Sequence, residues 1–366
     1  MILTITNYMH AHEFYLKGNT KVNTNQLKDL FSTYHLKGLE LKNRTMMSPM
    51  CQYSVEHKDG IATDWHYMHY VSRAIGGTAL IMIEMTDVEP DGRISDFDLG
   101  LWSDEQIPAL KRIVDACHSY GAKVGIQIAH AGRKAEDADI PVAPSAIAFD
   151  SNSKTPRALS TEEVKGMVEK FRSAVARAVQ AGFDTIEIHG AHGYLIHQFH
   201  SPLTNKREDE YGQDLTRFGR EVITAAKNEM PEDMPLLMRI SAKEYVEGGY
   251  GIQESIAFAK VYQSAGVDMF DISSGGEGQI AAWGKPGTHA AYQVPLAKEI
   301  KQALDIPVIA VGRLDDPIVA NAVIGNEESD LVAIGRGLLR NPYWTLEAAS
   351  LLKKETQIPT QYTTSF

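Results

Sequence analysis

The stretch STEEVKGMVEKFRSAVARAVQAGFDTIEIHGAHGY, residues 160–194, decides the fold of this 366-residue chain. Its first part has apolar residues at three- and four-residue spacing, which predicts an amphipathic helix over Thr161–Ala181. Ser160 opens a capping-box sequence, and Gly182 is a typical helix end. The apolar residues that follow predict a buried strand over Thr185–His189. A long helix that leads into a buried strand is the repeating unit of parallel α/β proteins.

The same alternation recurs along the chain. Helical spacing is clearest over Asp104–Tyr120, Thr161–Ala181, Leu215–Met230, Glu254–Ala265 and Tyr292–Leu304. Apolar runs that predict strands lie at Thr45–Met50, Ala79–Met85, Lys123–Ala129, Thr185–His189, Leu236–Ser241, Met269–Ser273, Pro307–Val311 and Leu331–Gly335. Eight strands, each followed by a helical segment, predict an α/β protein with a single (β/α)8 TIM barrel.

The barrel is expected to occupy residues 29–366. Residues 1–28 are polar and weakly patterned, which predicts an N-terminal extension. A doubly wound sheet is the alternative fold. It is disfavoured because no GxGxxG turn follows the first strand, and because eight units close a barrel naturally.

The composition, with 43% hydrophobic and 23% charged residues, is that of an ordinary soluble protein. Lys and Arg total 36 against 47 Asp and Glu, so the formal charge is −11 and neither nucleic acid nor an anionic membrane is an expected partner. The two cysteines, Cys51 and Cys117, have no disulfide or metal-ligand spacing, and no metal site is expected. Without a membrane span or a signal peptide, a cytoplasmic location is the expectation.

One strand end carries an unusual group of side chains. His189, His192 and Tyr194 lie at and just beyond the end of the strand Thr185–His189. Glycines among them let the backbone approach a ligand closely. Two imidazoles and a phenol at the carboxyl end of a barrel strand predict a functional site. The alternative is that both histidines are hydrogen-bonded packing residues.

Two further strand ends predict a phosphate site. VIAVGR (308–313) and LVAIGRGLL (331–339) each place a glycine and then an arginine after an apolar strand, namely Gly312-Arg313 and Gly335-Arg336. Backbone N–H groups at such turns, together with a guanidinium, form the phosphate site that follows strands 7 and 8 of this fold. Glycines that only ended the strands would leave the paired arginines unexplained.

Gln127 on the third strand and Arg239 on the fifth would lie near the barrel axis. A fixed positive charge and an amide suit a flat, electron-accepting heterocycle whose edge becomes anionic on reduction. Together with the phosphate site, this polar edge implies flavin mononucleotide (FMN). In the alternative, Arg239 pairs with a carboxylate such as Glu84 or Glu187 inside the barrel, and both interpretations can hold together.

Cys51 follows the segment Ser48–Met50 at the end of the first strand, and three interpretations are open. A thiol beside a flavin tunes its redox potential by hydrogen bonding or packing. A buried core cysteine is the second possibility. A nucleophile would need a base, which His189 or His192 could supply only across the barrel, so this third interpretation is disfavoured.

Taken together, these motifs resemble the Old Yellow Enzyme family of FMN-dependent ene-reductases, in particular its bacterial, thermophilic-like class of NADPH dehydrogenases. The resemblance covers nearly all of residues 30–362 and is carried by LKNRTMMSPMCQYS (41–54), HYVSRAIGG (69–77), DLGLWSDEQ (98–106), IQIAHAGRKA (126–135), APSAIAFD (143–150), IEIHGAHGYLIHQFHSPLTNKREDEYG (186–212), LMRISAKEY (237–245) and IGRGLLRNP (334–342). It implies bound FMN, NADPH or NADH as hydride donor, and a ping-pong hydride relay. The implied substrate is a small electron-poor alkene, an α,β-unsaturated carbonyl or nitro compound.

The resemblance also assigns residues. The implied flavin contacts are Ser48, Pro49, Met50, Cys51, Met85, Gln127, Arg239, Gly312, Arg313, Gly335 and Arg336. Among these, Cys51 is the redox-tuning thiol. Tyr53 lines the substrate side, His189 and His192 hold the carbonyl oxygen of the substrate, and Tyr194 is the proton donor.

Two positions depart from the family. Met85 stands where a small residue is usual against the flavin, so a backbone contact there would serve in a narrower pocket. The C-terminus keeps Tyr362 but has Thr364 near the place of an arginine that, in this class, reaches into the neighbouring subunit. A homo-oligomer, either a dimer or a tetramer, is still expected, without that arginine.

Two rival functions share part of the pattern. A phosphate-binding isomerase or aldolase would use strands 7 and 8 without a flavin, and Lys243 or Glu84 would be weak candidates for its catalytic lysine or carboxylate. A non-catalytic flavin-binding module would keep the phosphate site but would not need the cluster of His189, His192 and Tyr194.

Overall fold

The computed structural model describes residues 28–278 and 286–366. Its centre is a closed barrel of eight parallel strands, in which β3 pairs with both β4 and β13. Around the barrel the strands are β3 (Thr45–Met47), β4 (Leu80–Asp87), β6 (Lys123–Ala129), β9 (Thr185–Gly190), β10 (Leu236–Ser241), β11 (Met269–Ser273), β12 (Val308–Val311) and β13 (Leu331–Ile334). The predicted (β/α)8 TIM barrel is confirmed, and the doubly wound sheet is wrong.

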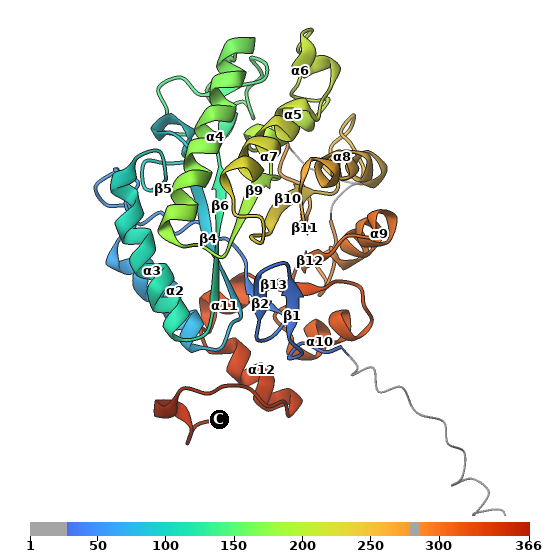
Figure 1. Ribbon diagram of the computed structural model, residues 1–366. Coiled ribbons are helices and arrows are strands. Elements are labelled where there is room, and N and C mark those ends of the chain that lie inside the picture. The colour runs from blue at the N-terminus through green and yellow to red at the C-terminus, as the bar shows by residue number, and fades with distance from the viewer. Residues whose placement is uncertain (1–27, 279–285) are drawn as a thin grey trace, which may run out of the picture.

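Helices cover the outside of the barrel (Figure 1). They are α2 (Asp64–Ile75), α3 (Ile107–Ser119), α4 (Thr161–Ala181), α5 (Leu195–His200), α6 (Glu210–Gln213), α7 (Arg217–Glu229), α8 (Ile252–Ala265), α9 (Val294–Leu304), α10 (Pro317–Gly325), α11 (Arg336–Arg340) and α12 (Trp344–Leu352). Three further short strands are β5 (Leu99–Gly100), which pairs in parallel with the carboxyl end of β4, and the pair β7 (Val142–Ala143) and β8 (Arg157–Ala158). Neighbouring helices pack on one another, as α3 does with α2 and α4.

Helix α4 occupies the range predicted for it. The Ser160 side chain accepts a hydrogen bond from the backbone N–H of Glu163, and the Glu163 carboxylate accepts one from the backbone N–H of Ser160, as a capping box requires. Gly182 ends the helix in the left-handed conformation, with φ 87°. The local sequence signals therefore fix both ends of this helix.

Several boundaries differ from the prediction by one to three residues, and two of these differences have a clear cause. Helix α3 begins at Ile107, because Asp104–Gln106 forms a separate 3-10 turn that Ser103 caps. Strand β3 ends at Met47 rather than Met50, since Pro49 has no N–H with which to continue the ladder. The chain after β3 is consequently free to run across the mouth of the barrel.

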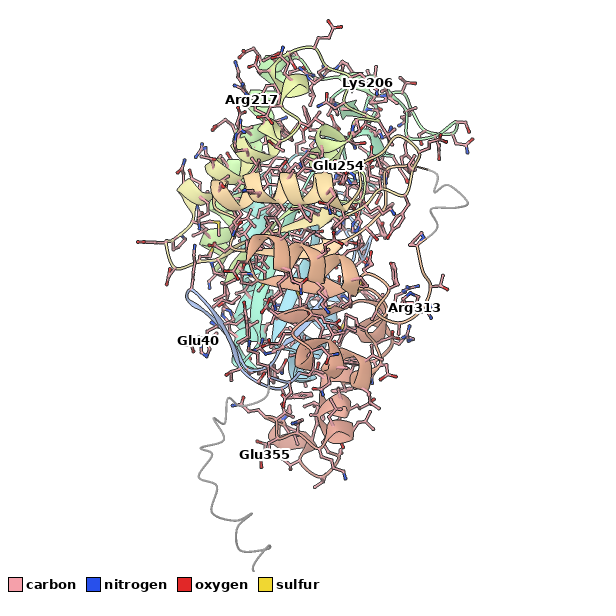
Figure 2. All side chains as sticks on the ribbon, turned by 90° about the vertical axis from the view of Figure 1, so that its right-hand side faces the viewer. Glu40, Lys206, Arg217, Glu254, Arg313 and Glu355 are labelled. Atoms are coloured by element: carbon pink, nitrogen blue, oxygen red, sulfur yellow. The ribbon has the colours of Figure 1, made fainter. Side chains whose placement is uncertain are left out.

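A hairpin closes the amino-terminal end of the barrel. Its strands are β1 (Tyr34–Leu36) and β2 (Leu39–Leu41). Leu39 and Leu41 are buried against side chains from the barrel strands, namely Met46, Leu80, Met82, Leu237, Met269, Ile309 and Leu331. Figure 2 shows Glu40 of the hairpin and Arg313, which follows β12, at opposite sides of the barrel. The barrel therefore opens at the carboxyl ends of its strands.

The predicted N-terminal extension, residues 1–28, lies outside the described residues except for Lys28, and it stays a prediction. The core begins close by, because Leu30 is fully buried. Within residues 28–278 and 286–366, no helix has both the length and the apolar composition needed to cross a bilayer.

The buried carboxyl of Glu84 joins β4 to two other segments. The pairing of β4 with β6 shifts register between Ile83 and Met85, so Glu84 lies at an irregularity of the ladder. Its Oε1 accepts a hydrogen bond from the backbone N–H of Gln52 at 2.8 Å, and its Oε2 accepts one from the Tyr70 hydroxyl at 2.5 Å. Burial raises the pKa of Glu84 to about 8, so this carboxyl is protonated at neutral pH.

Replacing Glu84 by glutamine should flatten the dependence of stability on pH between about pH 5 and pH 8. Folding raises the pKa of Glu84 from 4.5 to about 8. In this window the folded state holds a proton that the unfolded state releases, so the free energy of unfolding falls by up to about 1.4 kcal/mol per pH unit. Glutamine keeps an uncharged group that can bond Gln52 and Tyr70. Urea unfolding of both proteins across this range measures the slopes, and equal slopes would contradict the assignment.

Candidate active site

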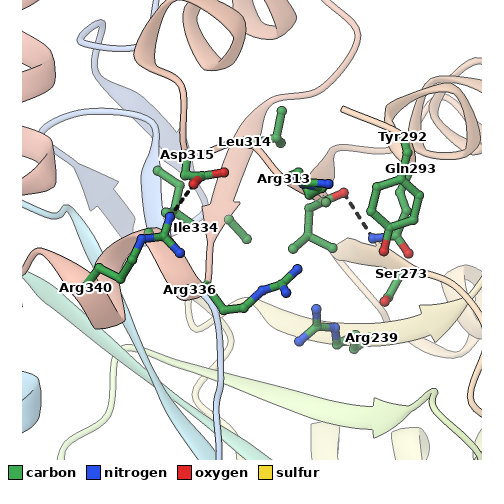
Figure 3. A pocket seen from close by; sticks show the side chains of 15 residues that line it. Arg239, Ser273, Tyr292, Gln293, Arg313, Leu314, Asp315, Ile334, Arg336 and Arg340 are labelled. Carbon is green, nitrogen blue, oxygen red and sulfur yellow. Dashed lines mark hydrogen bonds and ion pairs between the residues drawn. The ribbon is translucent and has the colours of Figure 1, made fainter. Parts of the chain in front are cut away.

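Two cavities open at the carboxyl ends of the strands. The first, of about 330 Å³, follows β11, β12 and β13 and is shown in Figure 3. It contains all four predicted phosphate residues, Gly312, Arg313, Gly335 and Arg336. Its other lining residues are Arg239, Ser273, Tyr292, Gln293, Val311, Leu314, Asp315, Ala333, Ile334, Gly337 and Arg340.

The turn after β12 is shaped to expose its backbone to the cavity. Gly312 has φ 122°, and a Cβ atom there would lie 3.0 Å from the Gln293 Nε2 atom and 3.1 Å from Tyr292. Arg313 is also left-handed, with φ 53°. Glycine is therefore required at position 312 by both conformation and space. Such a turn lets a phosphate oxygen approach backbone N–H groups closely.

Positive charge gathers in the same cavity. In Figure 3 the guanidinium groups of Arg336 and Arg239 extend into the region between them, while Arg340 pairs with Asp315. Arg313 donates a hydrogen bond to the carbonyl oxygen of Thr288. Guanidinium groups and glycine turns form a donor set that fits the phosphate of FMN.

Among the lining residues that were not predicted from the sequence, Tyr292, Gln293, Asp315 and Arg340 have large polar or charged side chains. Arg340 and its partner Asp315 belong to different strand–helix units, although Arg340 stands in the quoted motif IGRGLLRNP. Tyr292 and Gln293 precede α9 and come to the cavity only through the fold. A second arginine four residues after Arg336 was the signal that could have identified Arg340.

Gln127 and Arg239 are both buried at the open end of the barrel, as predicted. The Gln127 amide donates a hydrogen bond to Glu187 Oε1 at 2.7 Å. Arg239 lies 3.4 Å from the carboxylate of Asp271, and its Nη1 donates to Ser48 Oγ at 3.4 Å. Arg239 therefore pairs with a carboxylate inside the barrel, as the alternative interpretation expected, but the partner is Asp271 instead of Glu84 or Glu187. Its partner comes from β11, which stands in register with β10.

This polar cluster fits the edge of a flavin. In the described part of the chain, the Arg239 Nε atom, one oxygen of Glu187 and both oxygens of Asp271 have no hydrogen-bond partner. Burial, and then the neighbouring Asp271, raises the pKa of Glu187. Buried polar groups are rarely left without partners, so the cluster is suited to a polar ligand above it.

The segment after β3 runs along the mouth of the barrel. Ser48 accepts the hydrogen bond from Arg239, and Pro49 follows it half-buried. The Met50 sulfur lies 3.3 Å from where a Cβ atom would stand on Gly335, so this segment approaches the turn after β13. A side chain at position 335 would therefore crowd Met50.

The Cys51 thiol is in an acidic neighbourhood. Burial is the main cause that holds the pKa of Cys51 well above its ordinary value. The nearby carboxyls of Asp98, Glu84 and Asp87 raise this pKa further. The thiol is therefore protonated at neutral pH. A reactive cysteine nucleophile requires the opposite shift, so the structure disfavours that interpretation.

Met85 is buried and stands in register with Gln127 on the neighbouring strand β6. It belongs to a small apolar cluster that also includes Ala129 and that Cys51 and Tyr194 contact. Met85, one of the two departures from the family, therefore places a large flexible side chain beside Cys51 and Tyr194.

The second cavity, of about 570 Å³, lies after β3, β4, β6 and β9. Tyr53 and Tyr194 both line it, and Tyr53 is half exposed. Arg133, Lys134 and Phe149 complete one side of the cavity. The predicted substrate-side tyrosine and the predicted proton donor thus share one space.

His189, His192 and Tyr194 form a compact cluster, as predicted. The ring centroids of His189 and Tyr194 are 4.9 Å apart, and those of His189 and His192 are 5.2 Å apart. Burial, followed by the charge of Arg239, holds the pKa of both histidines well below the ordinary value, so both rings are neutral at pH 7. Burial also holds the pKa of the Tyr194 phenol well above its ordinary value.

The hydrogen bonds of the two histidine rings define what they can offer. His189 Nδ1 accepts a bond from the backbone N–H of Ala191 at 3.2 Å, so the ring proton is on Nε2, which can donate. His192 Nε2 lies 2.7 Å from Ser273 Oγ. A packing role alone therefore does not account for His189, because its Nε2–H group can still donate a hydrogen bond to a ligand.

Strand register connects the two cavities. His189 on β9 stands opposite Arg239 on β10, and side chains at paired positions of a parallel ladder point to the same face. Arg239 lines the first cavity, and His189 contacts Tyr194 in the second. A flat ring held above Arg239 would therefore lie beside the cluster of His189, His192 and Tyr194.

Arg133 and Lys134 were not assigned from the sequence. The Lys134 ammonium lies 5.4 Å from the centroid of the Tyr194 ring, and burial lowers the pKa of this lysine to about 8. Both residues directly follow β6, in a short 3-10 turn over Gly132–Lys134. Basic residues directly after a barrel strand were the signal that could have identified them.

Comparison with known proteins agrees with this geometry. The NADH:flavin oxidoreductase / NADH oxidase family matches residues 29–355. The NADPH dehydrogenase of Listeria monocytogenes serotype 4b (strain CLIP80459) is 50% identical over 339 residues, which are 92% of this chain and 98% of that protein. The NADPH dehydrogenase of Bacillus subtilis (strain 168) is 47% identical, with the same shares of 92% and 98%. The structure of morphinone reductase in complex with tetrahydroNAD has a TM-score of 0.75 at 27% identity, and covers 90% of this chain and 92% of that one.

These findings confirm the resemblance to Old Yellow Enzyme, with FMN as cofactor and a nicotinamide as hydride donor. The isomerase or aldolase and the non-catalytic module are therefore wrong. The chain is an FMN-dependent NAD(P)H oxidoreductase, and it belongs to the NADH:flavin oxidoreductase / NADH oxidase family.

Proposed function

We propose that this enzyme reduces the C=C bond of α,β-unsaturated carbonyl or nitro compounds, with hydride from NAD(P)H, in a ping-pong cycle. The observation that carries the proposal is the cluster of neutral His189, His192 and protonated Tyr194 beside the cavity of Tyr53. Such a cluster offers hydrogen-bond donors and one transferable proton without a free carboxylate base.

The two histidines are proposed to bind the oxygen of the substrate. As hydride reaches the β-carbon, negative charge develops on the carbonyl or nitro oxygen. Donors fixed in a buried site stabilise charge that is absent from the ground state, and this difference is what accelerates a reaction. The positive charge of Arg239, in register with His189, favours the same anionic state.

Tyr194 is proposed to give its proton to the α-carbon. Its pKa is held well above the ordinary value by burial, so the phenol is fully protonated at neutral pH. A weak acid of this kind transfers its proton only to a strongly basic carbon, such as that of an enolate. Nearby Lys134 places a positive charge against the Tyr194 ring, which stabilises the phenolate that remains.

FMN, when bound, accepts a hydride from NAD(P)H and delivers it to the alkene. The chain would hold its phosphate at the two Gly-Arg turns after β12 and β13, and its polar edge at Gln127 and Arg239. The segment Ser48–Cys51 would lie against its ring, with Cys51 as a neutral thiol that tunes its potential. The expected dimer or tetramer remains a prediction.

The proposal is tested by NADPH oxidation that depends on an added enone such as cyclohexenone. Replacing Tyr194 by phenylalanine should slow the oxidative half-reaction by about a hundredfold, since general acid catalysis contributes on that order. Reduction of the flavin by NADPH should stay close to the wild-type rate, because no proton is needed from Tyr194 there. Stopped-flow absorbance at the flavin band separates the two half-reactions.

Equal losses in both half-reactions of the Tyr194→Phe enzyme would show that the phenol supports the fold or the flavin instead of the substrate. A wild-type enzyme whose NADPH oxidation ignored every enone and nitroalkene would overturn the proposed reaction itself.

Removing both substrate-binding imidazoles should weaken the binding of phenols, which imitate the enolate. A hydrogen bond to a charged group contributes about 1.5–3 kcal/mol, so the double variant His189→Ala with His192→Ala should bind p-hydroxybenzaldehyde at least roughly tenfold more weakly. Calorimetric titration of the FMN-loaded protein measures the affinity. Unchanged affinity at equal FMN content would refute the assignment.

Replacing Cys51 by alanine should shift the flavin potential and leave turnover in place. A weak hydrogen bond of about 1 kcal/mol corresponds to roughly 20 mV for a two-electron couple. Spectroelectrochemical titration measures the shift. Complete loss of turnover in an enzyme that still carries FMN would favour a covalent role for the thiol and contradict the neutral-thiol assignment.

A further inference from the structure

The turn that leads from His192 to Tyr194 has an uncommon backbone conformation. His192 has φ 59° and Gly193 has φ 73°, so two consecutive residues are left-handed. A non-glycine residue in this region costs free energy and persists only where its surroundings hold it. Gly193 has no room for a side chain, because a Cβ atom would lie 2.3 Å from the carbonyl oxygen of Gly276.

Side chains hold all four backbone groups of this turn. The His192 N–H donates to Ser241 Oγ at 3.0 Å, and the His192 carbonyl accepts from Lys134 Nζ at 2.7 Å. The Gly193 N–H donates to His197 Nδ1 at 2.9 Å, and the Gly193 carbonyl accepts from Gln198 Nε2 at 2.8 Å. The turn is therefore fixed from several elements and has no backbone polar group left over.

His197 differs from the other three side chains because it is itself oriented by a buried acid. Since its Nδ1 atom accepts the bond from Gly193, the ring proton is on Nε2. That atom lies 3.1 Å from Glu244 Oε1 and 3.0 Å from the Tyr250 hydroxyl. Glu244 is fixed in turn, since its Oε2 accepts the backbone N–H of Tyr250 at 2.8 Å.

A cation site is the competing interpretation of this network. His197, Glu244 and Glu277 bring ligand atoms within 4.8 Å of one another. A metal would need the lone pair of His197 Nε2, and the bond from Gly193 to Nδ1 places the ring proton on that atom. Glu277 is already paired with Arg133 at 2.9 Å. The hydrogen bonds thus favour a positioning network.

We propose that His197, oriented by Glu244, is a positioning residue for the substrate clamp, in which His189 and His192 hold the substrate oxygen and Tyr194 protonates the α-carbon. Its ring accepts the N–H of the residue that lies between His192 and Tyr194, so it sets the spacing of the imidazole and the phenol. This role rests on the proposed function, because the distance between His192 and Tyr194 matters only for a substrate that contacts both.

Loss of this bond should affect substrate steps and spare the others. Buried Gly193 would keep an N–H without an acceptor, and the turn would relax toward a conformation that satisfies it. A small displacement of catalytic groups is costly for chemistry that depends on their exact position. Reduction of the flavin develops no negative charge on an oxygen and needs no proton from Tyr194, so it should depend less on this spacing. A purely structural histidine would instead lower FMN content and both half-reactions together.

The experiment compares two nearly isosteric variants in the full-length, FMN-loaded enzyme. His197→Asn keeps an acceptor oxygen near the position of Nδ1, whereas His197→Leu has a methyl group there. We expect the leucine variant to bind p-hydroxybenzaldehyde about tenfold more weakly and to lose about tenfold in the oxidative half-reaction. Reduction by NADPH should stay within about twofold, and the asparagine variant should recover most of the loss.

His200→Leu is the matched control. His200 is a buried histidine on the same helix, α5, and its ring bonds the hydroxyl of Tyr262 instead of the turn. It should leave phenol affinity unchanged. An amide spectrum of glycine-labelled protein adds a direct readout, because the Gly193 signal should move in the leucine variant and return in the asparagine variant.

Several outcomes would overturn the proposal. Equal behaviour of the leucine and asparagine variants would remove the role of the acceptor, as would parallel losses in both half-reactions. A leucine variant that bound phenol like the wild type would overturn the role of His197 alone. A wild-type enzyme that bound no phenol and reduced no enone would overturn the proposed function, and the clamp with it.

Discussion

The pairing of β3 with both β4 and β13 is the constraint on which the rest of the structure depends. Strand β3, the first of the barrel, has only three residues, Thr45–Met47, yet it pairs with both the second barrel strand and the last. Closure brings the carboxyl ends of all eight strands to one rim. Gly335, Arg239 and His189, which are far apart in the sequence, can share a site only because the sheet is a barrel.

Local signals were sufficient for many of the regular elements. Ser160 and Gly182 fix both ends of α4, and β6, β10 and β11 have the predicted bounds. The hairpin over Tyr34–Leu41 was missed, because strands of three residues are too short for a periodic pattern. The hairpin is stabilised by the packing of Leu39 and Leu41 on the barrel strands, and this contact exists only once the barrel has formed.

Strand-end residues could be predicted for the same reason, since the fold dictates where strand ends meet. Their partners could not. Arg239 pairs with Asp271 because these residues are in register on β10 and β11. The sequence of a buried strand does not show which residue of the neighbouring strand will stand beside it. No role was predicted for His197 and Gln198, and only the left-handed turn before them shows why their side chains point back to it. Tertiary contacts of this kind leave no local mark in the sequence.

The hairpin at the far end of the barrel has a consequence for how the reactants meet. Because Leu39 and Leu41 seal that end, a molecule that reaches Tyr194 enters through the cavity that Tyr53 lines. In the proposed reaction, nicotinamide and alkene would therefore exclude one another from the same space. Each would be a competitive inhibitor of the half-reaction that belongs to the other, so turnover would pass through a maximum as either concentration rises.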